Sequence, residues 1–81
     1  MRYPYKYYNK LGKLYLELAN LMKRAEQLEM NKDILLDDFI KEERQYILEK
    51  LGNIRYQMKE MGVDLKYRFK GEFWNDKDKN H

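Results

Sequence analysis

Two segments of the chain interleave cations with aromatic rings, the residue types that contact phosphates and stack on unpaired bases. One segment lies at the N-terminus and the other lies near the C-terminus. The candidate residues are Arg2, Tyr3, Tyr5, Lys6, Tyr7, Lys66, Tyr67, Arg68, Phe69, Lys70, Phe73 and Trp74. Their composition suits an interface with single-stranded nucleic acid, in which cations neutralise the backbone and rings accept bases. In the alternative interpretation, the rings close the end of a small core and the cations are simply solvated.

A second candidate surface combines apolar and acidic side chains in the middle of the chain. Its apolar members are Leu35, Leu36, Phe39 and Tyr46, and its acidic members are Asp37, Asp38 and Glu42. An apolar patch with an acidic rim is typical of a docking surface for a basic protein. Burial against a second copy of the chain, or against the C-terminal residues, would explain the same side chains.

Side chains suited to catalysis are scarce in this sequence. It contains no cysteine, serine or threonine, and its single histidine is the last residue, His81. The usual nucleophiles and an internal imidazole base are therefore missing. Asp76, Asp78 and Asn80 resemble the start of a calcium-binding loop, but His81 occupies the position of the required glycine. We predict a protein that is not an enzyme and that uses no cofactor and no metal.

Two apolar stripes define the elements that would position both surfaces, and each follows alternating steps of three and four residues when Arg44 is counted at the seam position between Ile40 and Ile47. The first stripe is Leu11, Leu14, Leu18, Leu21, Ala25 and Leu28, and the second is Ile40, Ile47, Leu51, Ile54, Met58 and Met61. This period indicates two long helices, and the polar break at residues 30–33 folds them into an antiparallel hairpin. Tyr8, Tyr15 and Met22 widen the first stripe, which predicts a broad buried face.

The ends of the second helix have their own signals. Asn31 or Asp33 is the predicted N-cap, because a short polar side chain can accept the unpaired N–H groups of the first turn. The apolar steps keep their phase through Gly52, so one helix is expected to reach Met61. Gly62 then supplies the left-handed residue that commonly ends a helix.

Beyond Gly62 the apolar residues alternate with polar ones, from Val63 to Lys70, as in a half-buried strand. Tyr3, Tyr5 and Tyr7 alternate in the same way and could pair with this segment. The predicted fold is therefore mainly α, a long antiparallel two-helix hairpin with a short C-terminal extended or β segment. We expect a single domain over residues 1–74 and a disordered polar tail at residues 75–81.

The charges divide unevenly along the chain. Residues 1–13 hold four cations and no acid, and residues 50–73 hold six cations and three acids. Residues 31–49 hold six acids and three cations. A hairpin would gather the basic segments at its open end and leave the acids near its turn, which makes the molecule bipolar.

The apolar residues outside the stripes offer more surface than one pair of helices hides, which predicts a homodimer with a four-helix arrangement. The longest apolar run, Ile34 to Leu36, is far shorter than the ~20 residues of a membrane span, so no membrane association is expected. The absence of cysteine fits a cytoplasmic protein. The excess of Lys, Asn, Ile and Tyr is typical of AT-rich genomes and suggests a phage or mobile-element origin.

These features together predict a non-enzymatic protein-protein interaction module. The specific expectation is a small regulator or inhibitor that occupies the surface of a partner protein. Two alternatives stay open. One is a nucleic-acid-binding accessory protein that uses the basic aromatic end, and the other is a structural self-assembly subunit.

Overall fold

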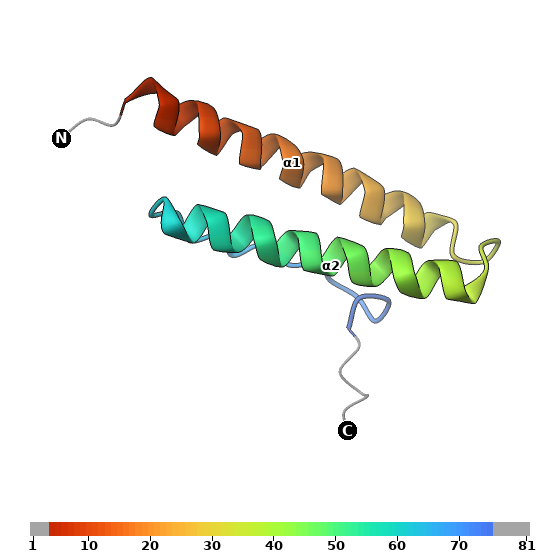
Figure 1. The fold of residues 1–81 in the computed structure, drawn as a ribbon. Coiled ribbons are helices and arrows are strands. Elements are labelled where there is room, and N and C mark those ends of the chain that lie inside the picture. The colour runs from red at the N-terminus through yellow and green to blue at the C-terminus, as the bar shows by residue number, and fades with distance from the viewer. Residues whose placement is uncertain (1–3, 76–81) are drawn as a thin grey trace.

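Two long helices lie antiparallel and form the body of the molecule (Figure 1). The computed structural model describes residues 4–75. Helix α1 spans Tyr5–Met30 and helix α2 spans Asp37–Glu60, with residues 31–36 connecting them at the closed end of the hairpin. The predicted helical hairpin is confirmed.

The two apolar stripes meet along the hairpin and form its core. Within residues 4–75, eleven side chains are buried: Leu14, Leu18, Leu21, Ala25, Leu28, Ile40, Ile47, Leu51, Ile54, Met58 and Trp74. Leu11 and Met61, the stripe members nearest the open end, are half-buried and pack against this core. Each helix therefore buries the seam that its three-and-four spacing predicts.

The broad buried face predicted for α1 is wrong within a single chain. Tyr8 is 57% exposed and Tyr15 is 46% exposed, whereas Met22 is half-buried against the core. The physical reason is that one facing helix covers only the central seam of α1. Side chains in the flanking column are covered only where another part of the chain reaches them.

The connection between the helices uses a different cap from the predicted one. Asn31 caps the C-terminus of α1, where its Nδ2 donates a hydrogen bond to the carbonyl of Gln27 at 2.8 Å. The N-cap of α2 is Leu36, which makes no side-chain capping bond. The prediction of Asn31 or Asp33 as this N-cap is therefore wrong. Asp37 and Asp38 lie in the first turn of α2, where their negative charges interact favourably with the positive end of the helix dipole.

Helix α2 continues through Gly52 and stops where the sequence predicts. Gly62 has a left-handed backbone with φ of 86°. The N–H of Val63 donates to the carbonyl of Met58 at 2.8 Å, and the N–H of Gly62 donates to the carbonyl of Lys59 at 3.0 Å. This pair of bonds is the Schellman motif, in which glycine avoids the strain that other residues suffer.

After this cap the chain turns back and runs along α2 toward the closed end (Figure 1). We call residues 63–75 the C-terminal segment. Residues 4–75 contain no strand, so a β segment is absent from this part of the chain. The predicted alternation is present as an alternation of burial, because the apolar residues from Val63 to Phe69 are half-buried and the intervening polar residues are exposed.

Tyr5 and Tyr7 do not pair with the C-terminal segment as strands. Tyr5 and Tyr7 belong to the first turn of α1. Their backbone is committed to the helix, as the bond from the N–H of Tyr7 to the carbonyl of Pro4 at 3.0 Å illustrates. Tyr3, Arg2 and the tail at residues 76–81 lie outside the described residues.

Candidate functional site

The aromatic side chains of the C-terminal segment pack together against one side of the hairpin. The rings of Phe69 and Trp74 stack with centroids 4.7 Å apart, and Phe73 meets Trp74 edge-on at 4.9 Å. Tyr67 meets Phe69 edge-on at 5.3 Å. Trp74 is only 7% exposed. These four predicted nucleic-acid candidates are therefore engaged in packing within the chain.

Polar contacts anchor the end of this aromatic cluster to both helices. The Nε1 of Trp74 donates a hydrogen bond to Oε1 of Glu29 in α1, at 3.1 Å. The Nη1 of Arg44 in α2 donates to the carbonyl of Phe73 at 3.3 Å, and its guanidinium lies 5.3 Å from the Phe73 ring centre. Arg44 interrupts the apolar seam of α2, and the C-terminal segment gives its charge a partner.

Arg55 anchors the middle of the C-terminal segment by hydrogen bonds, a role that was not predicted from the sequence. Its Nη2 donates to the carbonyl of Tyr67 at 2.7 Å, and its Nε donates to the carbonyl of Leu65 at 3.4 Å. Carbonyl groups without a ladder or helix partner need donors when they are half-buried, and an arginine fork supplies two. A usable signal was its place four residues after Leu51, beside the buried seam.

The structure separates the two basic aromatic segments that the hairpin was expected to unite. The hydroxyl of Tyr7 donates to the carbonyl of Met61 at 2.7 Å, at the open end of the hairpin. Phe73 and Trp74 instead lie beside Arg44 and Glu29, close to the turn. The separation arises because the C-terminal segment returns along α2 (Figure 1). Tyr5 and Lys6 are exposed at the open end, and Arg2 and Tyr3 lie outside the described residues.

The exposed cations of the C-terminal segment border a hollow between this segment and α2. We call it the basic hollow, with a volume of about 550 Å³ and cations from Arg55, Arg68 and Lys70. Its apolar wall comes from Leu48, Leu51, Phe69 and Trp74. Lys66 is exposed and forms a salt bridge with Asp64 at 3.5 Å. Cations and rings are thus neighbours here, although most of the ring surface is covered.

The closed end exposes several large apolar side chains. Ile34 is 80% exposed, Leu36 is 79% exposed and Met30 is 73% exposed. Phe39, in the first turn of α2, is 49% exposed. We call Met30, Ile34 and Leu36 the closed-end patch. Leu35, another interface candidate, is half-buried and packs against the core.

Several acidic side chains are close in sequence to the closed-end patch. Asp33, Asp37, Asp38 and Glu42 are all exposed, in the connection and the first turns of α2. Three of them are the predicted acidic members of the interface. The structure therefore brings the predicted apolar and acidic candidates to one end of the molecule, with Tyr46 farther along α2.

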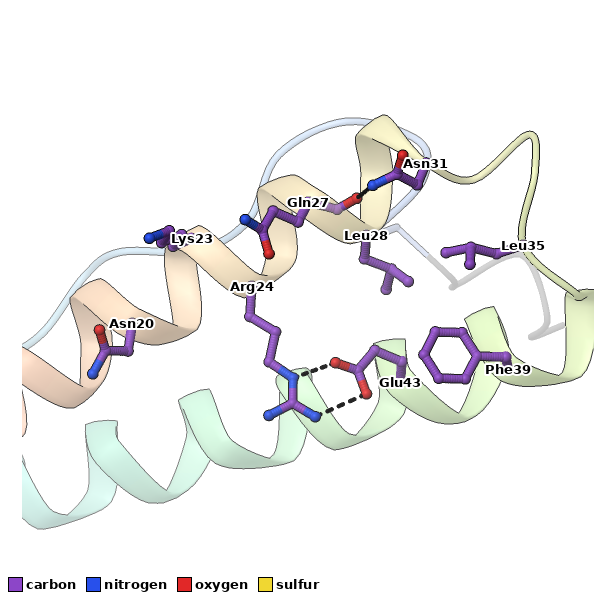
Figure 2. Close-up of a pocket in the computed structure, with 9 residues that line it drawn as sticks. All are labelled: Asn20, Lys23, Arg24, Gln27, Leu28, Asn31, Leu35, Phe39 and Glu43. Atoms are coloured by element: carbon purple, nitrogen blue, oxygen red, sulfur yellow. Dashed lines mark hydrogen bonds and ion pairs between the residues drawn. The ribbon is translucent and has the colours of Figure 1, made fainter.

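A second hollow lies between the two helices, on the side away from the C-terminal segment (Figure 2). Its volume is about 460 Å³, and Leu28, Leu35 and Phe39 line it. Arg24 and Glu43 form a bidentate ion pair across it, with the Nη2 of Arg24 donating to Oε1 of Glu43 at 3.0 Å. This hydrogen bond raises the pKa of Arg24 above its ordinary value. We call this space the interhelical hollow.

Tyr46 lies beside the same ion pair, where the guanidinium of Arg24 is 4.6 Å from its ring centre. Tyr46 is still 43% exposed. A cation over a ring face is attracted by the ring quadrupole, so Arg24 joins the two helices through both Glu43 and Tyr46.

No known protein family, curated protein or solved structure matches this chain. Within residues 4–75, no three acidic side chains are grouped closely enough to hold a metal ion. Neither helix of this described part combines the length and apolar character that crossing a bilayer requires.

Proposed function

We propose that the chain is a non-enzymatic protein-binding module that docks its closed end on a basic surface of a partner protein. The observation that supports it most directly is the exposure of the closed-end patch, where Met30, Ile34 and Leu36 are each between 73% and 80% exposed. Large aliphatic side chains grouped at one end of a small protein favour association, because contact with a partner removes them from water.

The charge around the closed-end patch favours a basic partner. Asp33, Asp37 and Asp38 flank the apolar side chains and are exposed. Acids at the rim of an interface steer a partner of opposite charge and set its orientation, while apolar contacts at the centre supply affinity. A hairpin that covers part of a partner in this way would act as a small regulator or inhibitor.

Affinity purification from the native host, with and without nuclease, tests this function when paired variants are compared. Leu36→Asp should abolish recovery of a nuclease-resistant partner, because it places a charge at the centre of the interface. Leu16→Asp is the matched control, since Leu16 is also exposed, at 63%, but lies in the middle of α1. Equal recovery by wild type and Leu36→Asp would refute docking through the closed end.

We further propose that the chain forms a homodimer through the side of the hairpin that carries the interhelical hollow. Phe39 and Tyr46 remain about half exposed there, at 49% and 43%. A second copy packed on this side would bury both and complete a four-helix arrangement.

Light scattering at micromolar concentration tests the dimer, with Phe39→Asp as the disrupting variant. The dimer predicts twice the chain mass for wild type and a monomer for Phe39→Asp. A wild-type monomer would overturn the dimer without affecting the docking proposal, because Leu36 tests that surface separately. Self-association with no partner captured would favour a purely structural role.

A further inference from the structure

We propose that the basic hollow binds the phosphate backbone of single-stranded nucleic acid. This hollow is a second surface, between α2 and the C-terminal segment, and it shares no lining residue with the closed-end patch. Arg55, Arg68 and Lys70 line it, and none of its lining residues in the described part of the chain is acidic. Three cations around one concave surface make a local site for phosphates.

The cations of the basic hollow are available to a ligand to different degrees. Arg68 and Lys70 are exposed, and neither forms a salt bridge within residues 4–75. Arg55 is half-buried and is fixed by its bonds to the carbonyls of Leu65 and Tyr67. The charge of Arg55 therefore has a fixed position in the lining of the hollow, while the exposed side chains of Arg68 and Lys70 can adjust to a phosphate.

The order of the cations fits a chain of phosphates better than one compact anion. Lys66, Arg68 and Lys70 occupy every second position of the C-terminal segment, and all three are exposed while Tyr67 and Phe69 between them are half-buried. They therefore follow one side of the segment as a row. Lys66 is held only by an exposed salt bridge to Asp64, and such pairs contribute little and are readily exchanged for another anion.

The apolar wall of the basic hollow determines which kind of nucleic-acid strand can bind there. Phe69 and Trp74 stack on each other at 4.7 Å, and Trp74 is only 7% exposed, so little aromatic surface remains for a base. Backbone contacts thus dominate, with little sequence preference. A flexible single strand can turn its bases toward Leu48 and Phe69 while its phosphates follow the cations, whereas the bases of a duplex are already paired and stacked.

Fluorescence anisotropy with a labelled oligo-dT strand tests this proposal in the full chain. Four phosphate contacts, from Arg55 and the row of three cations, give an expected slope of about −3 in log affinity against log salt, since each contributes about −0.7 in single strands. Affinity should then fall about 50-fold between about 50 and 200 mM salt. An oligo-U strand should bind similarly, because the cations address the backbone that both strands share.

A pair of double variants separates the hollow from net charge. Arg68→Gln/Lys70→Gln should weaken binding at least about 10-fold and lower the magnitude of the salt slope by more than 1, because it removes two of the four contacts. Lys13→Gln/Lys23→Gln removes the same charge from two exposed positions of α1 and should leave both quantities nearly unchanged. Circular dichroism checks that all variants are folded.

The only tryptophan of the chain provides an independent readout. Trp74 lines the basic hollow, so its fluorescence should change on saturation with oligo-dT, in wild type and in the closed-end variant Leu36→Asp. Three results would each overturn the proposal. They are no binding at 50 mM salt, an equal loss in both double variants, and equally tight binding of duplex DNA or poly-glutamate. None of them bears on docking through the closed end.

Discussion

The indole Nε1 of Trp74 donates a hydrogen bond to Oε1 of Glu29 at 3.1 Å, which joins the end of the C-terminal segment to the last turns of α1. The same ring stacks on Phe69 and belongs to the core. Trp74 therefore closes one side of the hairpin near the turn. The other ten buried side chains of the described residues all belong to the two helices, so Trp74 is the one buried side chain that joins the C-terminal segment to the core.

Trp74→Ala should lower the free energy of unfolding by about 3–5 kcal/mol, as expected for removal of a large buried ring. Such a loss is comparable with the whole stability of a domain this small, so the variant is expected to be largely unfolded. Trp74→Phe keeps most of the packing and loses the bond to Glu29, which should cost about 1 kcal/mol for the bond alone. Urea unfolding followed by circular dichroism measures both. A Trp74→Ala cost below about 1 kcal/mol would contradict docking of the segment.

Arg55→Met should loosen the C-terminal segment without unfolding the helices. Methionine keeps the apolar stem but cannot donate to the carbonyls of Leu65 and Tyr67. We expect a cost of about 1–3 kcal/mol, because half-buried carbonyls lose a charged donor. The backbone chemical shifts of residues 63–70, measured by nuclear magnetic resonance, should move toward random-coil values, while those of the buried middle of α2 stay unchanged. Lys59→Met is the control, since Lys59 is exposed on the same helix, and equal shift changes along the whole chain would contradict the prediction.

Replacing Gly52, within α2, and Gly62, in its C-terminal cap, by alanine should change the stability of the protein in opposite directions. Gly62 has φ of 86°, a conformation that costs alanine about 1 kcal/mol, so Gly62→Ala should destabilise the protein. Gly52 lies within α2, and a Cβ added there would meet nothing within 4 Å. Gly52→Ala should therefore stabilise the protein by about 0.5–1 kcal/mol. Thermal unfolding of both variants gives the two signs, and a stabilised Gly62→Ala would refute the left-handed cap.

The helical part of this fold was predictable because its signals are local and repeated. The stripe from Leu14 to Leu28 and the stripe from Ile40 to Met58 are buried, apart from Arg44, as their period requires. The end of α2 was also predictable, since Gly62 is followed by the apolar Val63. Each of these features depends on residues within a turn or two of one another.

The placement of the candidate sites depended on contacts between distant residues, which the sequence does not encode in a readable spacing. Glu29 is 45 residues from Trp74, and Arg55 reaches the carbonyls of Leu65 and Tyr67 only because the chain reverses at Gly62. Alternation in the C-terminal segment predicted one covered side correctly, but it did not specify α2 as the cover. Because the C-terminal segment packs along α2, Phe73 and Trp74 lie away from the open end.

Tyr56 provides a pH-dependent test of local structure on α2. Its side chain is 63% exposed, and a hydrogen bond to Glu60, one turn later, raises the pKa of the Tyr56 hydroxyl above its ordinary value. The negative charge of Glu60 acts in the same direction, because it opposes ionisation of the phenol. Since the pKa is higher in the folded state than in the unfolded chain, the contribution to stability is complete below about pH 10. It is lost as the pH rises through the folded-state pKa.

The chemical shift of the Tyr56 ring carbons against pH measures this effect directly by nuclear magnetic resonance. Glu60→Gln should lower the titration midpoint of Tyr56, because the amide removes the charge and weakens the acceptor. Glu42→Gln is the matched control, since Glu42 is an exposed acid near the other end of α2 and its removal changes the net charge equally. Identical Tyr56 midpoints in wild type and Glu60→Gln would show that the hydrogen bond does not form in solution. Equal decreases in both variants would assign the shift to net charge rather than to Glu60.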